Sequence, residues 1–417
     1  MSSNPLLESL DTPEKLEQFY HDHPRTFGSQ LDEALLEHPH SPLLHFWRSR
    51  LEFQKSRSQA IADPPNELPR LLLLCLGAIL LIKLPLLFPI AESWFYPRFA
   101  PFIVIGSLLV YFTLRKPPVL PETRIILGAV AAVLVTMALL PDDQTSSSII
   151  MATLHAPLVM WSALGLTFAA ANWRDSGARL NYLRYNGELF IYTVLILLGG
   201  FVLSGMTIGL FSLLNLDIQQ WYFNNVAVAG LVCAPLVASF LYDIVLRRQS
   251  RLATLIANVF TPLFLVMITL YLLAMLLQQQ SPFTDRNFLI LFNGLLLLVL
   301  AMTIFSIAGR NTLRPSRLAD CVNLGLISVT LLVNVVALSA IIYRLAEWGL
   351  TPNRVVVTGA NLLVFVHLIV IISAYIKLLR GRCEPEALTG AATGMLPVYG
   401  LWSLSVMLGL PLLFQFQ

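Results

Sequence analysis

The sequence predicts an all-α membrane protein, a polytopic helical bundle of about eleven transmembrane helices. Of its 417 residues, 56% are hydrophobic and 12% are charged, whereas an ordinary soluble domain carries roughly 25% charged residues. The apolar residues stand in blocks about twenty residues long, the length that a helix needs to cross a hydrocarbon layer about 30 Å thick. Lysine and arginine gather in alternate loops between these blocks. A backbone in lipid must satisfy its own hydrogen bonds, so we expect the blocks to be helices.

The first 68 residues differ in composition from the rest and are expected to form a short cytoplasmic helical segment. Residues 31–36 and 43–53 have the pattern of two short amphipathic helices. A segment this small buries little core, so we expect it to pack on the membrane domain or on a partner protein. It has no signal-peptide pattern, and the first span is therefore expected to act as its own insertion signal.

Residues 69–417 form the predicted transmembrane domain. The expected spans are 70–90, 99–114, 124–140, 149–171, 188–212, 224–246, 252–278, 287–309, 320–343, 355–378 and 395–414. Prolines and glycines inside them, including the Gly205-x-x-x-Gly209 pair, are typical of kinks or close helix contacts.

The positions of lysine and arginine predict the orientation of the spans. One set of alternate loops carries fifteen of them: Arg115, Lys116, Arg124, Arg174, Arg179, Arg184, Arg247, Arg248, Arg251, Arg310, Arg314, Arg317, Lys377, Arg380 and Arg382. The other set carries four: Arg98, Arg286, Arg344 and Arg354. Because basic loops are retained in the cytosol, the rich loops and the N-terminus are predicted to be cytoplasmic, and an odd number of spans places the C-terminus in the periplasm.

Several classes of function are excluded by missing motifs. The sequence contains no Walker loop, HExxH, GxSxG or CxxC pattern, and its loops are too short to form a soluble catalytic domain. The four cysteines lack any ligand spacing, so disulfides and cysteine metal sites are not expected. No basic patch of the nucleic-acid-binding type is present, and no cofactor is indicated. Any activity is therefore expected among the helices or at their ends.

Two ionisable residues fall at membrane depth, where charged groups are costly and often functional. His367 lies midway through the span at 355–378, where it could relay protons or act as a catalytic base. A neutral imidazole with one bond between helices is the simpler interpretation. Lys83 lies in the outer half of the first span; it either reaches the outer headgroups or pairs with an anionic group in a pocket.

Polar side chains recur in the outer halves of other spans. They are His155, Asn293 and Asn361, with Asn334 near the middle of its span. Amides in spans commonly bond neighbouring helices for about 0.6 kcal/mol. Together with Arg98, Arg344 and Arg354, these residues could instead line an outward-opening polar cavity. Helical periodicity does not determine whether they converge.

The outer loop at 343–354 has the most distinctive sequence. Gly349 permits a tight reversal, and Thr351 followed by Pro352 predicts a helix N-cap. Arg344 and Arg354 flank the turn, and Glu347 could pair with one of them. The loop is either a capped turn whose arginines sit among headgroups or an anion site at the outer mouth.

This loop resembles a bacterial membrane family known as domain-of-unknown-function 4153. The resemblance covers about a dozen residues, carried by Arg344, Trp348, Gly349, Leu350, Thr351 and Arg354, within a similar many-span layout. Trp348 stands where tyrosine is more usual in that family. The resemblance implies a bacterial inner-membrane protein and supplies no reaction.

Histidines cluster in the N-terminal segment. His21, His23, His38 and His40 form two HxH pairs, which are weak candidates for a metal site. No carboxylate spacing supports a familiar metal centre, and two of these histidines precede prolines, as turn residues often do. We therefore expect no metal.

Three functions remain open. The first is a transporter or lipid-handling protein for an anionic solute or lipid headgroup, with membrane lipids as its surroundings. The second is a membrane-embedded transferase. Asn334 and His367 resemble the asparagine–histidine pair of membrane-bound O-acyltransferases, although the surrounding signature of that family is missing. A lipid-linked glycosyltransferase that uses Asp142 and Asp143 is a variant of this hypothesis. The third is a non-catalytic membrane subunit that recruits a protein partner through its N-terminal helices.

Overall fold

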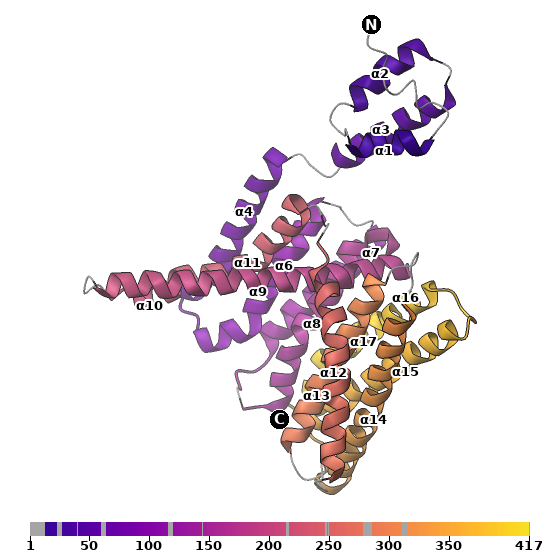
Figure 1. Cartoon of the computed structure of the whole chain (residues 1–417). Helices are drawn as coiled ribbons and strands as arrows, with labels where there is room; N and C mark the ends of the chain where they lie inside the picture. The colour runs from indigo at the N-terminus through magenta and orange to yellow at the C-terminus, as the bar shows by residue number, and fades with distance from the viewer. Residues whose placement is uncertain are drawn as a thin grey trace. The chain divides into compact units, whose positions relative to one another are not determined.

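The computed structural model describes residues 13–22, 27–39, 41–59, 64–115, 120–143, 145–213, 217–246, 248, 250–277, 286–310 and 316–416. These parts of the chain are helical, with no strands, and the structure is 88% helical (Figure 1). The predicted all-α class is confirmed. The chain divides into two compact units, Met1–Arg70 and Leu71–Gln417, where the sequence places the boundary at 68/69.

The N-terminal unit contains three helices, α1 (Pro13–Asp22), α2 (Phe27–Glu37) and α3 (Pro42–Gln59). The two predicted helices lie within α2 and α3, and α1 was not predicted. Their shared core is Leu16, Phe27, Leu31, Ala34, Leu35, Leu44 and Trp47. Arg50 from α3 bonds Glu17 of α1 at 2.6 Å and lies over the Trp47 ring. That hydrogen bond is the main cause of the raised pKa of Arg50.

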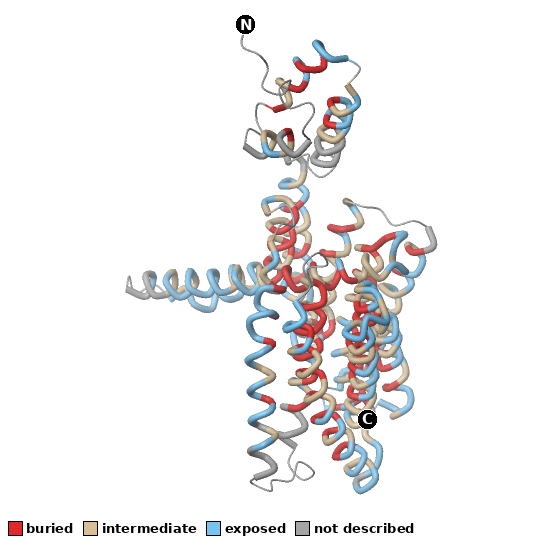
Figure 2. Tube along the Cα trace, turned by 45° about the vertical axis from the view of Figure 1, so that its right-hand side comes forward, coloured by how far each residue is buried: buried red, intermediate tan, exposed pale blue. Residues whose placement is uncertain are grey.

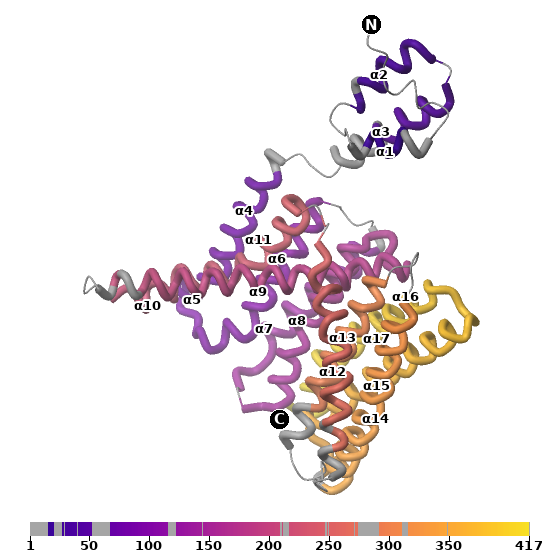
Figure 3. Tube along the Cα trace, in the orientation of Figure 1, coloured from indigo at the N-terminus to yellow at the C-terminus, as the bar shows by residue number. Residues whose placement is uncertain are grey.

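The remaining helices form the larger unit, except that α4 begins before the boundary at Leu71. They are α4 (Pro64–Ile82), α5 (Leu84–Leu87), α6 (Glu92–Arg115), α7 (Leu120–Leu139), α8 (Ser147–Ala169), η2 (Ala170–Asn172), α9 (Ser176–Leu213), α10 (Gln219–Tyr222), η3 (Phe223–Ala227), α11 (Val228–Phe240), η4 (Leu241–Val245), α12 (Leu252–Leu277), α13 (Arg286–Gly309), α14 (Arg317–Trp348), α15 (Pro352–Leu379), α16 (Glu386–Thr393) and α17 (Leu396–Leu413). Figure 3 follows their order along the chain.

Ten helices in the described part of the chain are long and apolar enough to cross a membrane, compared with about eleven predicted. The predicted first span corresponds to α4 and α5, which the ten do not include. α4 nevertheless runs antiparallel to α6. Leu71, early in α4, packs in one cluster with Tyr111 near the end of α6, whereas Ile82, at the end of α4, packs in another with Phe95 near the start of α6. α4 therefore passes through the same layer of the bundle as α6.

The fifth predicted span, 188–212, is only the second part of α9, a helix of 38 residues. The stretch expected to be an arginine-bearing loop is helical from Ser176 onward, so that boundary was wrong. Asp175 starts the helix by accepting a hydrogen bond from the Ala178 N–H at 2.8 Å. At 1.5 Å per residue α9 is about 57 Å long, and in Figure 1 it lies across the direction of α12 and α13.

The two halves of α9 differ in burial. Its first half buries Leu180, Tyr182, Leu183 and Leu189 against neighbouring helices. Among its described residues after Leu189, none is buried, and this half is mostly pale blue in Figure 2. Large apolar side chains there, such as Phe201 at 76% exposure, face outward, as expected for a helix surrounded by lipid.

The bundle has several packed cores. α8 packs against α6, α7 and α17 around Met137, Val159, Met160 and Met407. α12, α13 and α14 form a second group around Ile268, Val299, Leu326 and Val333. A third core joins α9, α13, α14, α15 and α16. The short helix α16, which was not predicted, contributes Leu388, Ala391 and Ala392 to it.

Candidate functional site

His367, the predicted catalytic candidate, is buried at 1% exposure in α15. Its Nε2 lies 3.1 Å from the Ala391 carbonyl, and its Nδ1 lies 3.1 Å from the Tyr399 hydroxyl. A neutral ring satisfies both contacts if Nε2 donates to the carbonyl and Nδ1 accepts from Tyr399. The imidazole therefore joins α15 to α16 and α17, which is the simpler of the two interpretations.

The described hydrogen bonds of His367 and of the predicted amide residues do not link them to one another. Asn334 is fully buried, and its side-chain nitrogen contacts the Asn361 carbonyl at 3.4 Å. Asn361 donates its own side-chain N–H to the Val357 carbonyl within α15. Asn293 and Asn334 each hold a buried side-chain oxygen without a partner in the described structure. Asn334 and Asn361 are thus together, as a contact between α14 and α15.

Lys83 and His155 are both engaged by backbone carbonyls. Lys83 marks the break between α4 and α5, just before Pro85, and donates to the carbonyl of Asn224 and to the side chain of Asn225 at 2.9 Å. These asparagines belong to η3, a π-helical turn whose looser winding leaves carbonyls for such contacts. His155 lies 2.8 Å from the Met151 carbonyl of its own helix.

The outer loop is a capped turn. Gly349 adopts φ 72°, and the Thr351 hydroxyl accepts from the Arg354 N–H at 3.4 Å at the start of α15. The Arg354 guanidinium donates to the Gly349 carbonyl at 2.7 Å. Glu347 is exposed, and the side chain of Trp348 lies outside the described residues. The predicted N-cap is confirmed, and the Arg354 bond closes the turn on itself.

The remaining outer candidates also have structural partners. Arg98, which is 7% exposed, donates to the carbonyls of Met137, Leu140 and Pro141 and so caps the end of α7. Asp143 accepts hydrogen bonds from the N–H and hydroxyl of Thr145, and the hydroxyl bond is the main reason that the pKa of this exposed carboxyl is lowered. Asp142 lies 3.9 Å from Arg98.

The N-terminal histidines form no described metal site. His23 and His40 lie outside the described residues, as does the side chain of His21, while His38 is exposed. Among the residues that the structure describes, no group of three or more metal-ligating side chains comes together.

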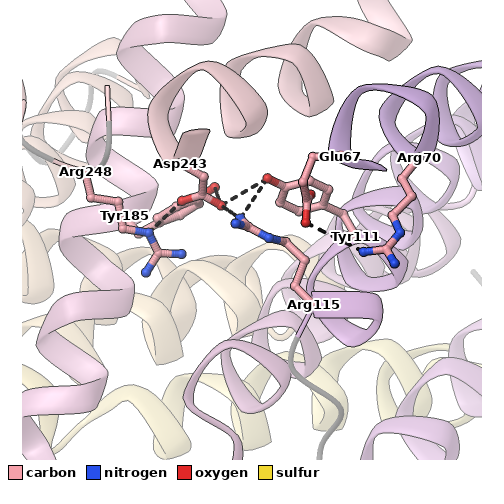
Figure 4. A network of polar contacts seen from close by, with 7 residues as sticks. All are labelled: Glu67, Arg70, Tyr111, Arg115, Tyr185, Asp243 and Arg248. Carbon is pink, nitrogen blue, oxygen red and sulfur yellow. Dashed lines mark hydrogen bonds and ion pairs between the residues drawn. The ribbon is translucent and has the colours of Figure 1, made fainter. Parts of the chain in front are cut away.

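A buried carboxylate that sequence reasoning missed lies at the arginine-rich ends of the helices. Asp243, in η4, is 1% exposed and lies 2.6 Å from Arg115 of α6 and 2.6 Å from Arg248 (Figure 4). The Tyr111 hydroxyl lies 3.1 Å from it and that of Tyr185 3.5 Å. Both carboxylate oxygens are engaged, so this cluster is a clamp that joins α6, α9 and η4.

A second missed cluster borders a cavity. Arg310, which follows α13, donates through Nε and Nη2 to Asp320 of α14 at 3.1 and 2.9 Å. These bonds raise the pKa of Arg310. The side chains are 13% and 6% exposed. The third guanidinium nitrogen, Nη1, is buried and has no hydrogen-bond partner in the described structure.

The cavity beside this pair has a volume of about 450 Å³ and lies among α12, α13 and α14. Polar groups extend from it between the helices. Asn323 donates to Ser306 at 2.8 Å, and Ser306 lies 3.4 Å from Asn258. Asn323 is 3% exposed, and its side-chain oxygen has no described partner. Tyr375 forms part of the wall.

The chemistry of this cavity is that of a small polar site. A buried N–H left without a partner costs about 1–3 kcal/mol, so Arg310 Nη1 favours an acceptor oxygen from water or a ligand. The Asn323 oxygen favours a hydroxyl or ammonium hydrogen. Asp320 engages only Nε and Nη2 of Arg310, so Nη1 is the donor left for an acceptor oxygen, and the site therefore suits a group that offers both acceptors and donors.

Neither missed cluster was among the predicted site residues, although the sequence contains a signal for both. Asp243 and Asp320 fall inside the predicted spans 224–246 and 320–343, near the ends that adjoin arginine-rich loops. An acid at such a position must be paired or solvated. That rule would have indicated both carboxylates, but not which of the nearby arginines pairs with each.

Comparisons with known proteins add no identity to this geometry, because no family model, curated protein or solved structure matches the chain.

Proposed function

We propose that this chain is a transporter or lipid-handling protein that takes an anionic headgroup or solute into the cavity among α12, α13 and α14. The observation that carries the proposal is the Arg310–Asp320 pair beside this cavity. Arg310 Nη1 is buried without a described partner, and the side-chain oxygen of Asn323, which lines the same cavity, is also without one. The proposal moves the binding site from the outer mouth to the arginine-rich ends of the helices.

The ligand chemistry follows from these two atoms. A phosphate or carboxylate oxygen would accept from Arg310 Nη1, and a neighbouring hydroxyl or ammonium group would donate to Asn323. Phospholipid headgroups and small hydroxylated anions share this chemistry.

The proposed location is a bacterial inner membrane, with the arginine-rich ends and the N-terminal unit on the cytosolic side, as the basic loops and the resemblance to the family of unknown function suggest. The ligand would then enter from the cytosol or the inner leaflet. Membrane lipids are the proposed surroundings of the exposed helices.

A binding experiment tests this site directly. The purified protein would be titrated with sn-glycerol 3-phosphate as a soluble probe, and separately reconstituted in vesicles with or without phosphatidylglycerol. Arg310→Gln should weaken binding about tenfold or more, because one hydrogen bond to a charged group contributes about 1.5–3 kcal/mol. Arg317→Gln is the matched control, since Arg317 is exposed at the start of α14 and does not line the cavity.

The outcomes separate the possible ligands. Binding of the soluble probe favours a solute, whereas binding of phosphatidylglycerol alone favours a lipid headgroup. Equal affinity of the Arg310→Gln and Arg317→Gln proteins for both probes would reject the cavity as an anion site. Arg344→Ala with Arg354→Ala tests the original outer-mouth hypothesis in the same assay.

A second function is favoured by the N-terminal unit. Its three helices enclose a core of their own, yet Leu36 and Phe46 are 84% and 61% exposed. Exposed apolar side chains on a small module suit a protein partner. Replacing both with serine should abolish co-purification of such a partner without altering probe binding at Arg310.

The transferase hypothesis remains a prediction. A His367→Ala protein that retained its activity would reject it.

A further inference from the structure

A groove on another side of the bundle has the shape and lining of a lipid site. It lies among α7, α8 and α17, has a volume of about 330 Å³, and is lined mainly by apolar side chains. Two glycines form part of its wall. A Cβ on Gly165 would lie 2.8 Å from the Tyr182 ring, and a Cβ on Gly400 would lie 2.9 Å from the Ser162 hydroxyl. Glycine at both positions allows the close packing behind the groove.

The groove is open along its side to the surroundings of the bundle. Ile125 and Leu401, which line it, are 51% and 64% exposed. These side chains lie on helices long and apolar enough to cross a membrane. A molecule in the groove would therefore be reached from the lipid phase, and its buried part must be apolar.

One end of the groove is polar and basic. Arg179 donates to the Thr393 carbonyl at 3.2 Å and to the Arg174 carbonyl at 2.8 Å, while its Nε is buried without a described partner. The exposed guanidinium of Arg174 lies 4.9 Å from the centre of the Trp173 ring, and Trp173 also lines the groove. Asp175, the acid in this turn, is engaged in capping α9.

We propose that this groove holds one acyl chain of an anionic phospholipid, with the phosphate at Arg174 and Arg179. The apolar lining suits a hydrocarbon chain, the two guanidiniums suit a phosphate, and tryptophan is typical of the level at which headgroups lie. A detergent-like or neutral occupant would match the lining but not the basic end. The proposal is independent of the Arg310 cavity, which lies on other helices.

Photolabelling tests the proposal in reconstituted vesicles. Two probes would be used, phosphatidylglycerol and phosphatidylcholine, each with a photoreactive diazirine on an acyl chain. We expect label on the peptides of α7, α8 and α17 that line the groove, displaced by unlabelled phosphatidylglycerol. Ala129→Phe fills the groove from α7 and should remove this label. Ala131→Phe, on the exposed side of the same helix, should leave it unchanged.

A separate variant tests whether the basic end of the groove recognises the phospholipid's charge. Arg179→Gln should lower the preference for phosphatidylglycerol over phosphatidylcholine about tenfold, which corresponds to one charge-assisted hydrogen bond, while the exposed Arg380→Gln should not. Label spread evenly over lipid-facing helices such as α12, and equal in the Ala129→Phe and Ala131→Phe proteins, would overturn the proposal. Size-exclusion profiles of all four variants would exclude misfolding as the cause of lost label.

Discussion

Asp243 illustrates how a buried charged residue is tolerated near the arginine-rich ends of the helices. Its carboxylate is 1% exposed but bonds two arginines, one of which, Arg248, remains 48% exposed. Arg248 also lies over the rings of Phe168 and Tyr185. The charge is thus shared between buried and solvated partners, which lowers the cost of its desolvation.

Removing this charge takes one ion pair from Arg115 and one from Arg248. We expect Asp243→Asn to lower the free energy of unfolding by about 3 kcal/mol, near the lower end for a broken buried pair because Arg248 can turn to water. Thermal unfolding of the detergent-solubilised protein measures this change. Asp32→Asn, on an exposed position of α2, should have little effect. Equal midpoints for the two variants would contradict the role assigned to Asp243, and Asp243→Asn with Arg115→Gln should recover part of the loss.

At this scale the sequence predicted residue types better than residue roles. The N-cap at Thr351 was predictable because its hydrogen bond is local. His367 was predictable as a buried residue, whereas its partners Tyr399 and Ala391 lie at least 24 positions further along the chain. Arg310 and Asp320 are only ten residues apart, but the cavity beside them depends on α12, whose register against α13 and α14 no local pattern specifies.

At the scale of helices, apolar length was the reliable signal. The predicted spans coincide with long helices because twenty consecutive apolar residues have few alternatives. The missed portions lack a long apolar run: α1 and the first half of α9 mix charged residues with core residues, and α16 has only eight residues. The start of α9 was read as a loop because Arg179 and Arg184 suggested exposure, whereas both lie on the partly buried side of a helix.

The contact between α15 and α17 depends on a glycine. A Cβ on Gly359 would overlap the Trp402 ring, so we expect Gly359→Ala to destabilise the protein by about 1–3 kcal/mol through overpacking. Gly294→Ala is the matched control in α13, where a Cβ meets nothing within 4 Å. That change should be neutral or stabilising by up to about 1 kcal/mol, because alanine favours helix. The thermal unfolding midpoint of the Gly359→Ala protein should lie below that of the Gly294→Ala protein. A Gly359→Ala protein as stable as the unsubstituted one would disprove the close contact.

The half of α9 that follows Leu189 is expected to lie in lipid. A nitroxide attached to a cysteine at Leu198 or Phe201, which are 59% and 76% exposed, should collide more often with oxygen than with a water-soluble nickel complex. A nitroxide at the exposed Arg174 should show the opposite preference. Protection of Leu198 and Phe201 from both reagents would indicate instead that another protein covers this half of the helix.

At the scale of the whole molecule, the orientation of the later helices in the membrane does not depend on whether α9 crosses it. This helix and the segment from α10 to η4 pack against each other as a hairpin. A hairpin adds either two crossings or none, so the helices that follow keep the same orientation in both cases. α4 runs antiparallel to α6, so Leu71, where the larger unit begins, lies on the same side of that unit as Tyr111.

This arrangement predicts which turns face the cytosol. In a protein whose four native cysteines have been replaced, Thr145→Cys and Gln415→Cys should react with a membrane-impermeant maleimide added to intact spheroplasts, because both positions are exposed at the arginine-poor side. Arg174→Cys, exposed in the turn between α8 and α9, should react only after the membrane is permeabilised. Reaction of Arg174→Cys alone in intact spheroplasts would show that the bundle has the opposite orientation. The Arg310 cavity and the Arg179 groove would then face the periplasm. Reaction of Thr145→Cys and Arg174→Cys together would show that α8 does not cross, which the packing of α6, α7 and α17 around it makes incompatible with this fold.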